Sequence, residues 1–278
     1  MTQTRTLAEF EATLPWQNSV RDNMRDLALR VLALGKRINN QNNWLRFPFY
    51  HHVFDDEREG FHRHLDHLKN IGDFVTLDDA VEQLTSGQPI DGRYFCLTFD
   101  DGFKSCKDNA MPALVERDIP AGFYIVTDMM GRHLTADDPT ARAVFGFRGK
   151  STDLDFITWD DCREMVAAGM TIGSHTCSHP KLIALSDLAV SDEMTKSKRL
   201  IEKELDAPCQ HFCAPYGIPN HHFDVIRDPD LAKAAGYTSF VTGQRGAMTK
   251  SGNPFFIQRD QLRGAWGLHQ LRYFLSRP

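Results

Sequence analysis

The residue type and the spacing of His175 and His179 make these two histidines candidates for a chemical role. A separation of four residues places two imidazoles on one side of a helical turn, where both can reach a single ion. Histidine is also the commonest metal ligand and titrates near neutral pH. The pair alone leaves two interpretations open, a metal site and two hydrogen-bonded surface histidines.

A second candidate is the acidic pair Asp100 and Asp101, which follows an apolar run and precedes Gly102. Asp-Asp-Gly after a strand could be a simple turn in which Gly102 takes a positive φ. The side chains of consecutive residues point in different directions, however, so the two carboxylates can divide the work. One can bind an ion while its neighbour accepts a proton from water on that ion.

These residues need a scaffold, and the sequence alternates short β-rich runs with helical patterns. The runs that we predict as strands are 44–51, 94–99, 122–126, 170–172, 210–213, 238–241 and 255–258. The patterns that we predict as helices are 59–70, 104–117, 159–168, 187–205 and 222–235. Such alternation favours parallel strands with helical crossovers, and about seven repeats favour an α/β fold, a distorted (β/α) barrel that is closed or nearly closed.

The predicted barrel indicates where an active site would lie, because active sites of such barrels lie in the loops after the carboxyl ends of the strands. Three groups of polar residues fit that position, Asp100 with Asp101, Ser174–His179 and Ala214–Gly217. We therefore expect these groups to converge. The longest irregular stretch, 136–156, is either a substrate-facing loop or a surface insertion.

Composition narrows the class of protein. The 278 residues are 41% hydrophobic and 25% charged, which argues against disordered, collagenous and membrane-spanning chains. A net charge of −5 gives no electrostatic reason to expect a nucleic-acid partner. The six cysteines form no C-x-x-C pair, and the N-terminus lacks a basic stretch followed by an apolar run. We therefore expect a reduced, cytoplasmic protein without an integral membrane segment.

An amphipathic helix is predicted near the N-terminus, ending near Gly35. Its apolar positions are Val20, Met24, Leu27, Val31 and Leu34, spaced by four and three residues in turn. The helix could lie on a membrane surface, but its polar face mixes charges of both signs, so we favour packing on a domain. We expect residues 1–44 to form a helical extension packed on a barrel of residues 45–278.

The two motifs together resemble those of a known family. Thr98–Gly102 and Ser174–His179 are similar to the first two motifs of the polysaccharide deacetylase family, carbohydrate esterase family 4, also called the NodB-homology domain. Further similar segments occur in the same order, and the resemblance spans about residues 45 to 262. These further segments are Tyr50–Val53, Ile119–Tyr124 and Phe212–Gly217.

The resemblance implies a NodB-like barrel and a set of roles. By similarity, Asp101, His175 and His179 bind a divalent metal, usually Zn²⁺, and Asp100 is the general base. The physical chemistry agrees, because three protein ligands leave one coordination position for water. By the same similarity, the backbone N–H of Tyr216 stabilises the oxyanion.

The sequence departs from the family pattern at the third motif. That motif often begins with an arginine that positions the catalytic aspartate, and here the place holds Cys213. Arg259 resembles an arginine common in a subset of the family and is a candidate substitute. The alternative is a surface salt bridge of Arg259 with Asp260 or a neighbour.

The family's general acid is a late histidine in a Leu-x-His context, and the matching residue is His269. It matches poorly, because it lies on a predicted terminal helix rather than in a loop after a strand, and a structural role is the alternative. His133, His221 and His222 could reach the site from loops, but we favour exposed positions for all three.

These observations predict a metal-dependent hydrolase that removes acetyl groups from N-acetylated amino sugars of a glycan or glycan precursor. One alternative is a hydrolase of a small non-sugar amide. Another is a glycan-binding module without catalysis, but Asp100 argues against that module because binding alone needs no base.

Overall fold

The computed structural model describes residues 2–11, 16–38, 42–149 and 152–276, and its centre is a seven-stranded sheet. All neighbouring strands in this sheet run parallel, and most are buried along their whole length, as expected when helices cover a parallel sheet. In spatial order the strands are β12 (Ser239–Val241), β11 (His211–Cys213), β10 (Thr171–Ser174), β7 (Ala121–Ile125), β6 (Leu97–Phe99), β3 (Pro48–Tyr50) and β13 (Asp260–Gln261).

The sheet curls until its two edges meet. A parallel bridge joins Val241 at the end of β12 to Ile257, just ahead of β13 at the other edge. The distorted barrel of about seven parallel strands that the sequence predicts is therefore confirmed. One predicted strand is wrong, because in 255–258 only Ile257 makes a bridge, and the strand itself is Asp260–Gln261.

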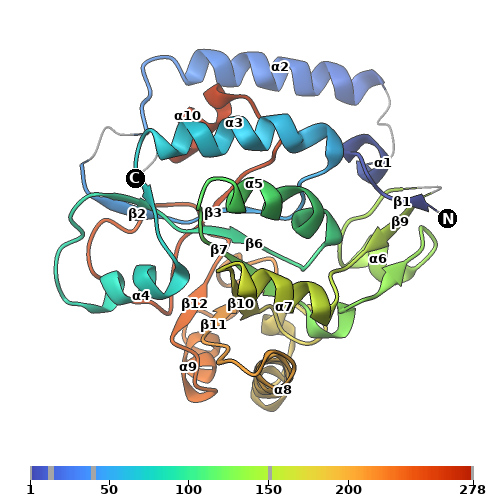
Figure 1. The fold of residues 1–278 in the computed structure, drawn as a ribbon, viewed down its shortest axis with the longest axis vertical. Helices are drawn as coiled ribbons and strands as arrows, with labels where there is room; N and C mark the ends of the chain where they lie inside the picture. The colour runs from blue at the N-terminus through green and yellow to red at the C-terminus, as the bar shows by residue number, and fades with distance from the viewer. Residues whose placement is uncertain (1, 12–15, 39–41, 150–151, 277–278) are drawn as a thin grey trace.

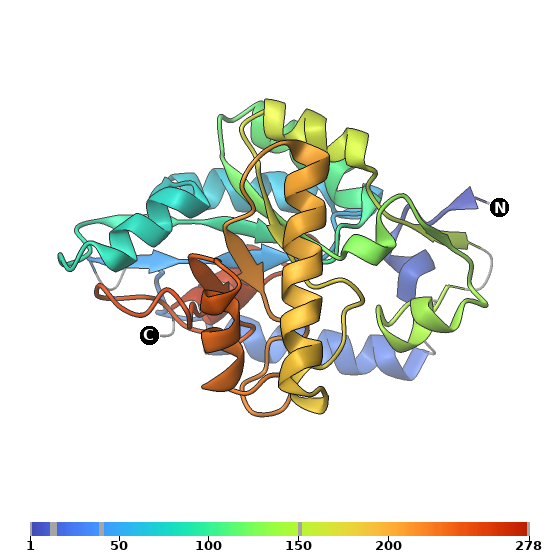
Figure 2. The same cartoon turned by 90° about the horizontal axis from the view of Figure 1, so that it is seen from below.

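Helices cover the outside of the barrel (Figure 1), and Figure 2 shows two of them, α8 and α9, side by side. The covering helices are α3 (Arg58–Lys69), α5 (Met111–Val115), α7 (Trp159–Ala167), α8 (Asp187–Leu205) and α9 (Arg227–Ala234). A hydroxyl caps the amino end of two of them, Thr158 for α7 and Ser186 for α8. This capping explains why the sequence predicts the start of both helices correctly.

Of the other three predicted helices, 59–70 and 104–117 are largely correct and 222–235 is partly wrong. The range 104–117 is helical from Lys104 to Val115, with a π-helical turn at Cys106–Ala110 ahead of α5. The range 222–235 becomes helical only at Arg227, because the Asp224 carboxylate accepts hydrogen bonds from the backbone N–H groups of Ile226 and Arg227. Such an aspartate turn competes with the helix over the preceding residues.

Helix α4 (Leu77–Thr85), which the sequence analysis does not predict, fills the amino end of the barrel. Its apolar face belongs to one cluster with Tyr124, Cys213, Val241 and Ile257 from the strands. Leu77 packs so closely on β7 that a Cβ at Gly122 would lie 2.2 Å from its side chain. The barrel is thus closed at its amino end, and the carboxyl end remains for the site.

Two small sheets flank the barrel. One holds β2 (Trp44–Arg46), β5 (Arg93–Phe95) and β4 (Asp73–Phe74), so the predicted strands 44–51 and 94–99 are each split between two sheets. The other holds β1 (Thr2–Gln3), β9 (Thr152–Asp155) and β8 (His133–Leu134). The remaining short elements are α6 (Pro139–Ala143) and the 3₁₀ turns Asp55–Glu57, Thr127–Met129 and Leu182–Ala184.

The N-terminal residues form α1 (Leu7–Glu11) and α2 (Trp16–Leu32), and α2 packs on the last helix, α10 (Leu268–Leu275). Figure 1 shows α2 at the outer edge of the molecule, beyond α3 and α10. No helix in the described ranges combines the length and the apolar character that a membrane crossing needs.

The predicted packing face of α2 is wrong. Met24, Leu27, Val31 and Leu34 are 68%, 64%, 60% and 77% exposed, and the side chain of Val20 lies outside the described part. The helix is buried instead along Leu29 and Ala33. The Asp26 carboxylate on the packed side bonds the His269 ring of α10 at 2.6 Å, so a polar contact orients the helix.

Candidate active site

Four of the predicted site residues meet at the carboxyl end of the barrel. Asp100 and Asp101 directly follow β6, and His175 and His179 follow β10, with only β7 between these two strands. All four side chains are buried. The convergence that the sequence predicts for these loops is therefore present in the structure.

Asp101 and the two histidines aim their ligand atoms at one another. Asp101 Oδ1 lies 3.4 Å from His175 Nε2 and 3.2 Å from His179 Nε2. That carboxylate oxygen is buried and has no hydrogen-bond partner. His175 Nδ1 donates a hydrogen bond to the carbonyl of Cys213 at 2.8 Å, which leaves its Nε2 free to bind a cation.

This donor set fits a divalent metal. Three ligand atoms, two imidazole nitrogens and one carboxylate oxygen, lie within 4.8 Å of one another. Two imidazoles and a carboxylate are typical of a Zn²⁺ site that keeps a position open for water or substrate. The residues present could therefore hold the ion that the resemblance implies.

The backbone at the site is strained. Asp101, Thr176, His179 and Tyr216 have φ values of +72°, +70°, +60° and +60°, in the left-handed region that non-glycine residues rarely adopt. Four of the seven such residues in the described chain thus lie at this one place. Strain of this kind is retained where the surrounding structure holds a functional geometry.

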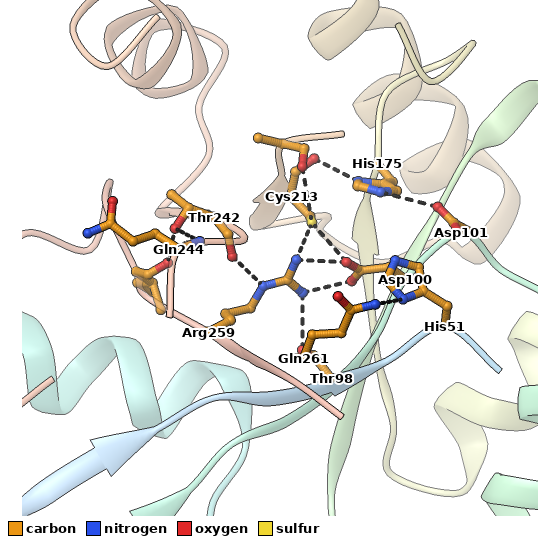
Figure 3. Close-up of polar contacts among 12 residues, drawn as sticks. His51, Thr98, Asp100, Asp101, His175, Cys213, Thr242, Gln244, Arg259 and Gln261 are labelled. Atoms are coloured by element: carbon orange, nitrogen blue, oxygen red, sulfur yellow. Dashed lines mark hydrogen bonds and ion pairs between the residues drawn. The ribbon is translucent and has the colours of Figure 1, made fainter. Parts of the chain in front are cut away.

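Asp100 is held by Arg259. The guanidinium donates two parallel hydrogen bonds, from Nη1 to Asp100 Oδ1 and from Nη2 to Asp100 Oδ2, each 2.7 Å long (Figure 3). Such a two-pronged contact fixes the plane of a carboxylate. Figure 3 shows this pair next to Cys213, the last residue of β11.

Arg259 is itself fully enclosed. Its Nε donates to the carbonyl of Thr242 at 2.8 Å, and its Nη2 lies 3.0 Å from the Cys213 sulfur. The side chain is 1% exposed, and the guanidinium lies 4.1 Å from the centre of the Phe49 ring. The alternative of a surface salt bridge with Asp260 is wrong, because Asp260 instead pairs with Arg46 at 3.0 Å.

Electrostatics keep both aspartates charged. Burial by itself raises the pKa of Asp100, but the charge and hydrogen bonds of Arg259 outweigh it and lower that pKa below its ordinary value. Burial likewise opposes ionisation of Asp101, yet its close contacts with the His175 and His179 rings bring its pKa well below the usual range. Two adjacent carboxylates are therefore ionised, each stabilised by its own partners.

Tyr216 forms one rim of the site. Its ring centre lies 4.6 Å from that of His179 and 5.0 Å from that of His222, and its side chain is 37% exposed. His222 is thus near the rim, where its Nδ1 accepts a hydrogen bond from the backbone N–H of Ile218. Burial raises the pKa of Tyr216, so its hydroxyl stays neutral.

Two other histidines do not come to the site. The His269 ring bonds Asp26 at the contact between α10 and α2, because its helix is held there rather than at the barrel mouth. His133 lies between Asp153 and Asp155 in the small sheet of β8 and β9. The structure gives both rings partners of their own, and neither is among the ligand atoms described above.

The sequence analysis missed His51 as a site residue. It follows β3 directly and lines a cavity of about 220 Å³ together with Asp101, Phe145 and Arg263. Its Nδ1 lies 3.3 Å from the amide nitrogen of Gln261. The sequence did contain a signal for His51, because it is a polar residue directly after a strand, where the active-site residues of such barrels lie.

The long stretch 136–156 contributes to the same cavity. Phe145 lines it, and its ring centre lies 5.4 Å from that of His179. Helix α1 forms the opposite wall through Leu7, Phe10 and Glu11. The stretch is therefore a wall of the site at Phe145, and the N-terminal residues border the site too.

Comparison with known proteins gives one family. The polysaccharide deacetylase profile matches residues 87–240. A putative polysaccharide deacetylase of Bacillus subtilis, YxkH, is 24% identical over 218 residues, which are 77% of this chain and 64% of that protein. The poly-beta-1,6-N-acetyl-D-glucosamine N-deacetylase of Staphylococcus aureus is 24% identical over 195 residues, 67% of this chain and 60% of that protein. The chain thus spans less than two thirds of the length of these relatives.

Solved structures agree on the fold. The structure of IcaB from Ammonifex degensii superposes with a TM-score of 0.70 at 21% sequence identity. The superposition covers 85% of this chain and 98% of that one. The overall fold is therefore shared with this solved protein.

Proposed function

Because the chain belongs to the polysaccharide deacetylase family, we propose that it is a metal-dependent hydrolase that removes the acetyl group from an N-acetylated amino sugar and releases acetate. One observation carries the proposal: Asp101, His175 and His179 converge beside an Asp100 that Arg259 clamps. A carboxylate next to a cation site is the arrangement that base-assisted attack of water on an amide needs.

Asp101, His175 and His179 would hold the ion, most simply Zn²⁺. When bound there, the ion supplies a Lewis acid that activates water and polarises the acetyl carbonyl. The Cys213 carbonyl fixes the ring of His175 through the 2.8 Å hydrogen bond. Partners of this kind set the tautomer and direction of a ligating imidazole.

Asp100 would accept the proton of the attacking water. Arg259 donates to both carboxylate oxygens, and the Cys213 thiol donates to Oδ2 at 3.7 Å, so Oδ1 keeps an acceptor position for the water. The lowered pKa keeps Asp100 ionised at neutral pH, so it is ready to take that proton. The clamp also prevents rotation of the carboxylate away from the water.

The backbone N–H of Tyr216 would donate to the oxyanion that develops as water adds to the acetyl carbonyl. The leaving amine must gain a proton, and His51 is our candidate donor in place of His269. It lines the cavity with Asp101, and its positive form lowers the pKa of both Asp100 and Asp101. It is thus within electrostatic reach of the reacting groups.

The cavity favours a compact substrate or the end of a chain. Its volume of about 220 Å³ is below the roughly 300–1,000 Å³ of pockets that enclose a drug-sized ligand. The same observation keeps a small non-sugar amide as the second candidate substrate. A binding module without catalysis is disfavoured, because Arg259 restores the orienting group that Cys213 lacks.

An acetate-release screen on protein purified without chelator tests the proposal. The substrates are chitooligosaccharides, poly-β-1,6-N-acetylglucosamine, nucleotide-linked N-acetylated amino sugars, acetylated xylan and small non-sugar amides. We expect acetate from at least one amino sugar, and none from the same substrate with Asp100→Asn protein. Cleavage of non-sugar amides alone would select the second candidate, and metal-loaded protein inert on the whole panel would contradict both.

The cytoplasmic location of the protein stays a prediction.

A further inference from the structure

The exposed large apolar side chains of the described residues are concentrated on α2. Met24, Leu27, Val31, Leu32 and Leu34 lie on or just after this helix and are at least 52% exposed. The other exposed apolar residues are spread over α5, α7, the start of α8 and the loops before α8 and α9. Single exposed apolar residues are normal on a protein surface, whereas a continuous stripe marks an interaction surface.

Basic residues border this stripe on both sides. At about 100° per residue, Arg25 lies to one side of Met24 and Arg30 lies to the other, and both are exposed. Lys36 and Arg37 follow just after the helix. The one acidic residue between 24 and 38 is Asp26, which binds His269 on the packed side and Arg30. The outer face of α2 is therefore apolar in its centre and positive at its edges.

We propose that α2 docks the protein on an anionic phospholipid surface. The helix would lie in the plane of the headgroups, with Met24, Leu27 and Val31 in the acyl boundary and the arginines against lipid phosphates. Arginines that flank an apolar stripe keep their charged ends in the headgroup layer while their stems cover apolar surface. The helix does not cross the bilayer, in keeping with the absence of a spanning helix from the described ranges.

Charge separates this occupant from a second copy of the chain. Two copies pairing through this face would bring the positive borders of both helices together, and like charges across an interface cost binding energy. An anionic bilayer satisfies the apolar centre and the positive borders at once. The docking surface also lies close in sequence to the site, because α1, which lines the cavity, immediately precedes α2.

Cosedimentation with vesicles tests the proposal and requires no catalytic activity. Wild-type protein should bind vesicles of phosphatidylcholine mixed with phosphatidylglycerol, and the Leu27→Glu/Val31→Glu variant should bind them about 10-fold more weakly or worse. The matched control is Leu188→Glu/Ile226→Glu, which changes residues that are 76% and 74% exposed elsewhere. This control should bind like the wild type, and circular dichroism should show both variants folded because all four side chains face solvent.

A second pair of variants tests the charge. Arg25→Gln/Arg37→Gln should weaken binding to the mixed vesicles, and rising salt should weaken binding of the wild type in the same way. Failure of the wild type to bind the mixed vesicles, or equal binding by the α2 variant and its control, would overturn the proposal. So would a dimer in sedimentation velocity that dissociates on Leu27→Glu/Val31→Glu substitution, which would assign the face to a second copy.

Discussion

Adjacent carboxylates take different partners because their side chains leave the strand end in different directions. Asp100 turns to Arg259, while Asp101, in a left-handed backbone conformation, turns to His175 and His179. The sequence could predict that the pair divides its roles, since consecutive side chains diverge. It could not predict that Arg259, the residue just before β13, reaches Asp100 from 159 residues further along the chain.

The ligand set predicts how metal content responds to substitution. Protein purified without chelator should contain about one divalent ion per chain, and His175→Ala or His179→Ala should lose most of it because two remaining ligands hold zinc poorly. Elemental analysis measures this. His222→Ala is the matched control, because His222 lies at the rim against Tyr216 and should keep its metal. Full occupancy in both ligand variants would show that the metal assignment is wrong.

The roles of the two aspartates can be separated by amide substitutions. Asp100→Asn keeps the shape but cannot accept a proton, so metal content should stay while the rate of acetate release falls about 10²-fold or more. Asp101→Asn should instead reduce metal content. If both variants kept their metal and lost rate equally, the division of roles between the two residues would be incorrect.

Arg259 should matter for rate as well as for stability. Arg259→Ala leaves the Asp100 charge buried without its partner, which should cost about 3–5 kcal/mol of stability and about 10- to 10³-fold in rate through misplacement of the base. Arg259→Lys should recover little, because an ammonium cannot make the two-pronged contact. Arg46→Ala is the control: it breaks another buried pair, with Asp260, and should lower stability without a comparable loss of rate.

The same substitution should change the pH profile. Arg259 is what lowers the Asp100 pKa, so in the wild type the acid limb of kcat/KM should lie below the ordinary value of 3.8. In Arg259→Ala the raising effect of burial on that pKa is opposed only by the weaker effects of the His175 and His51 charges, so the limb should move to higher pH. An acid limb at the same pH in both proteins would mean that Asp100 is not the group observed.

Elements with strong local signals were predictable. Both ends of helix α8 were predicted correctly, because a hydroxyl cap marks its start and its helical pattern extends over a long stretch of sequence. The range 104–117 is helical over most of its length, but the π-helical turn inside it was not predicted because apolar spacing does not reveal it. The packed face of α2 failed because the Asp26–His269 contact and the buried Leu29 decide the orientation, and neither belongs to the apolar stripe.

At the site, sequence reasoning was limited by the same dependence on neighbours. His269 was matched through its local context, yet α10 is held against α2. His51 was not predicted as a site residue, although it follows β3, the strand that pairs with β6 just before Asp100. The arrangement of the whole barrel decides which strand ends are neighbours, and the sequence of a single loop does not reveal it.

The hairpin of β8 and β9 should respond to pH through His133. Hydrogen bonds with Asp155 and then Asp153 raise the pKa of His133, against a small opposing effect of burial. A raised pKa in the folded state stabilises the fold fully below the unfolded value near 6.5, and the contribution disappears as pH rises through the raised value. The Tm difference between wild type and His133→Gln should therefore be larger at pH 6 than at pH 9.

The effect should be modest, since the ring is half exposed and solvent screens its charge. The matched control is His221→Gln, which removes an exposed histidine outside the sheet of β8 and β9. A His133→Gln difference that stays constant, or that grows with pH, would contradict the assignment of the charge to this histidine.

For the molecule as a whole, the N-terminal residues are part of the site's surroundings. Thr2–Gln3 pair with Thr152–Asp153, the backbone of Arg148 donates to the carbonyl of Phe10, and Arg263 pairs with Glu11 at 3.0 Å. A boundary between an extension of residues 1–44 and a barrel of 45–278 stays a prediction. These contacts mean that a protein cut at that boundary would lose one wall of the cavity.

That wall should set which substrates fit. Phe10 lines the cavity, and its ring centre lies 4.5 Å from that of His52 and 5.5 Å from that of Phe147. Phe10→Ala removes the ring and opens the cavity on the side of α1, where a longer chain would have to pass. The ratio of kcat/KM for an acetylated oligomer to kcat/KM for a single acetylated sugar should therefore rise roughly 10-fold.

Phe74→Ala is the control for this prediction. It truncates a half-buried ring that packs on Phe95 outside the cavity lining, so it should leave the ratio unchanged. Equal ratios in wild type and Phe10→Ala would mean that α1 does not limit the length of the substrate.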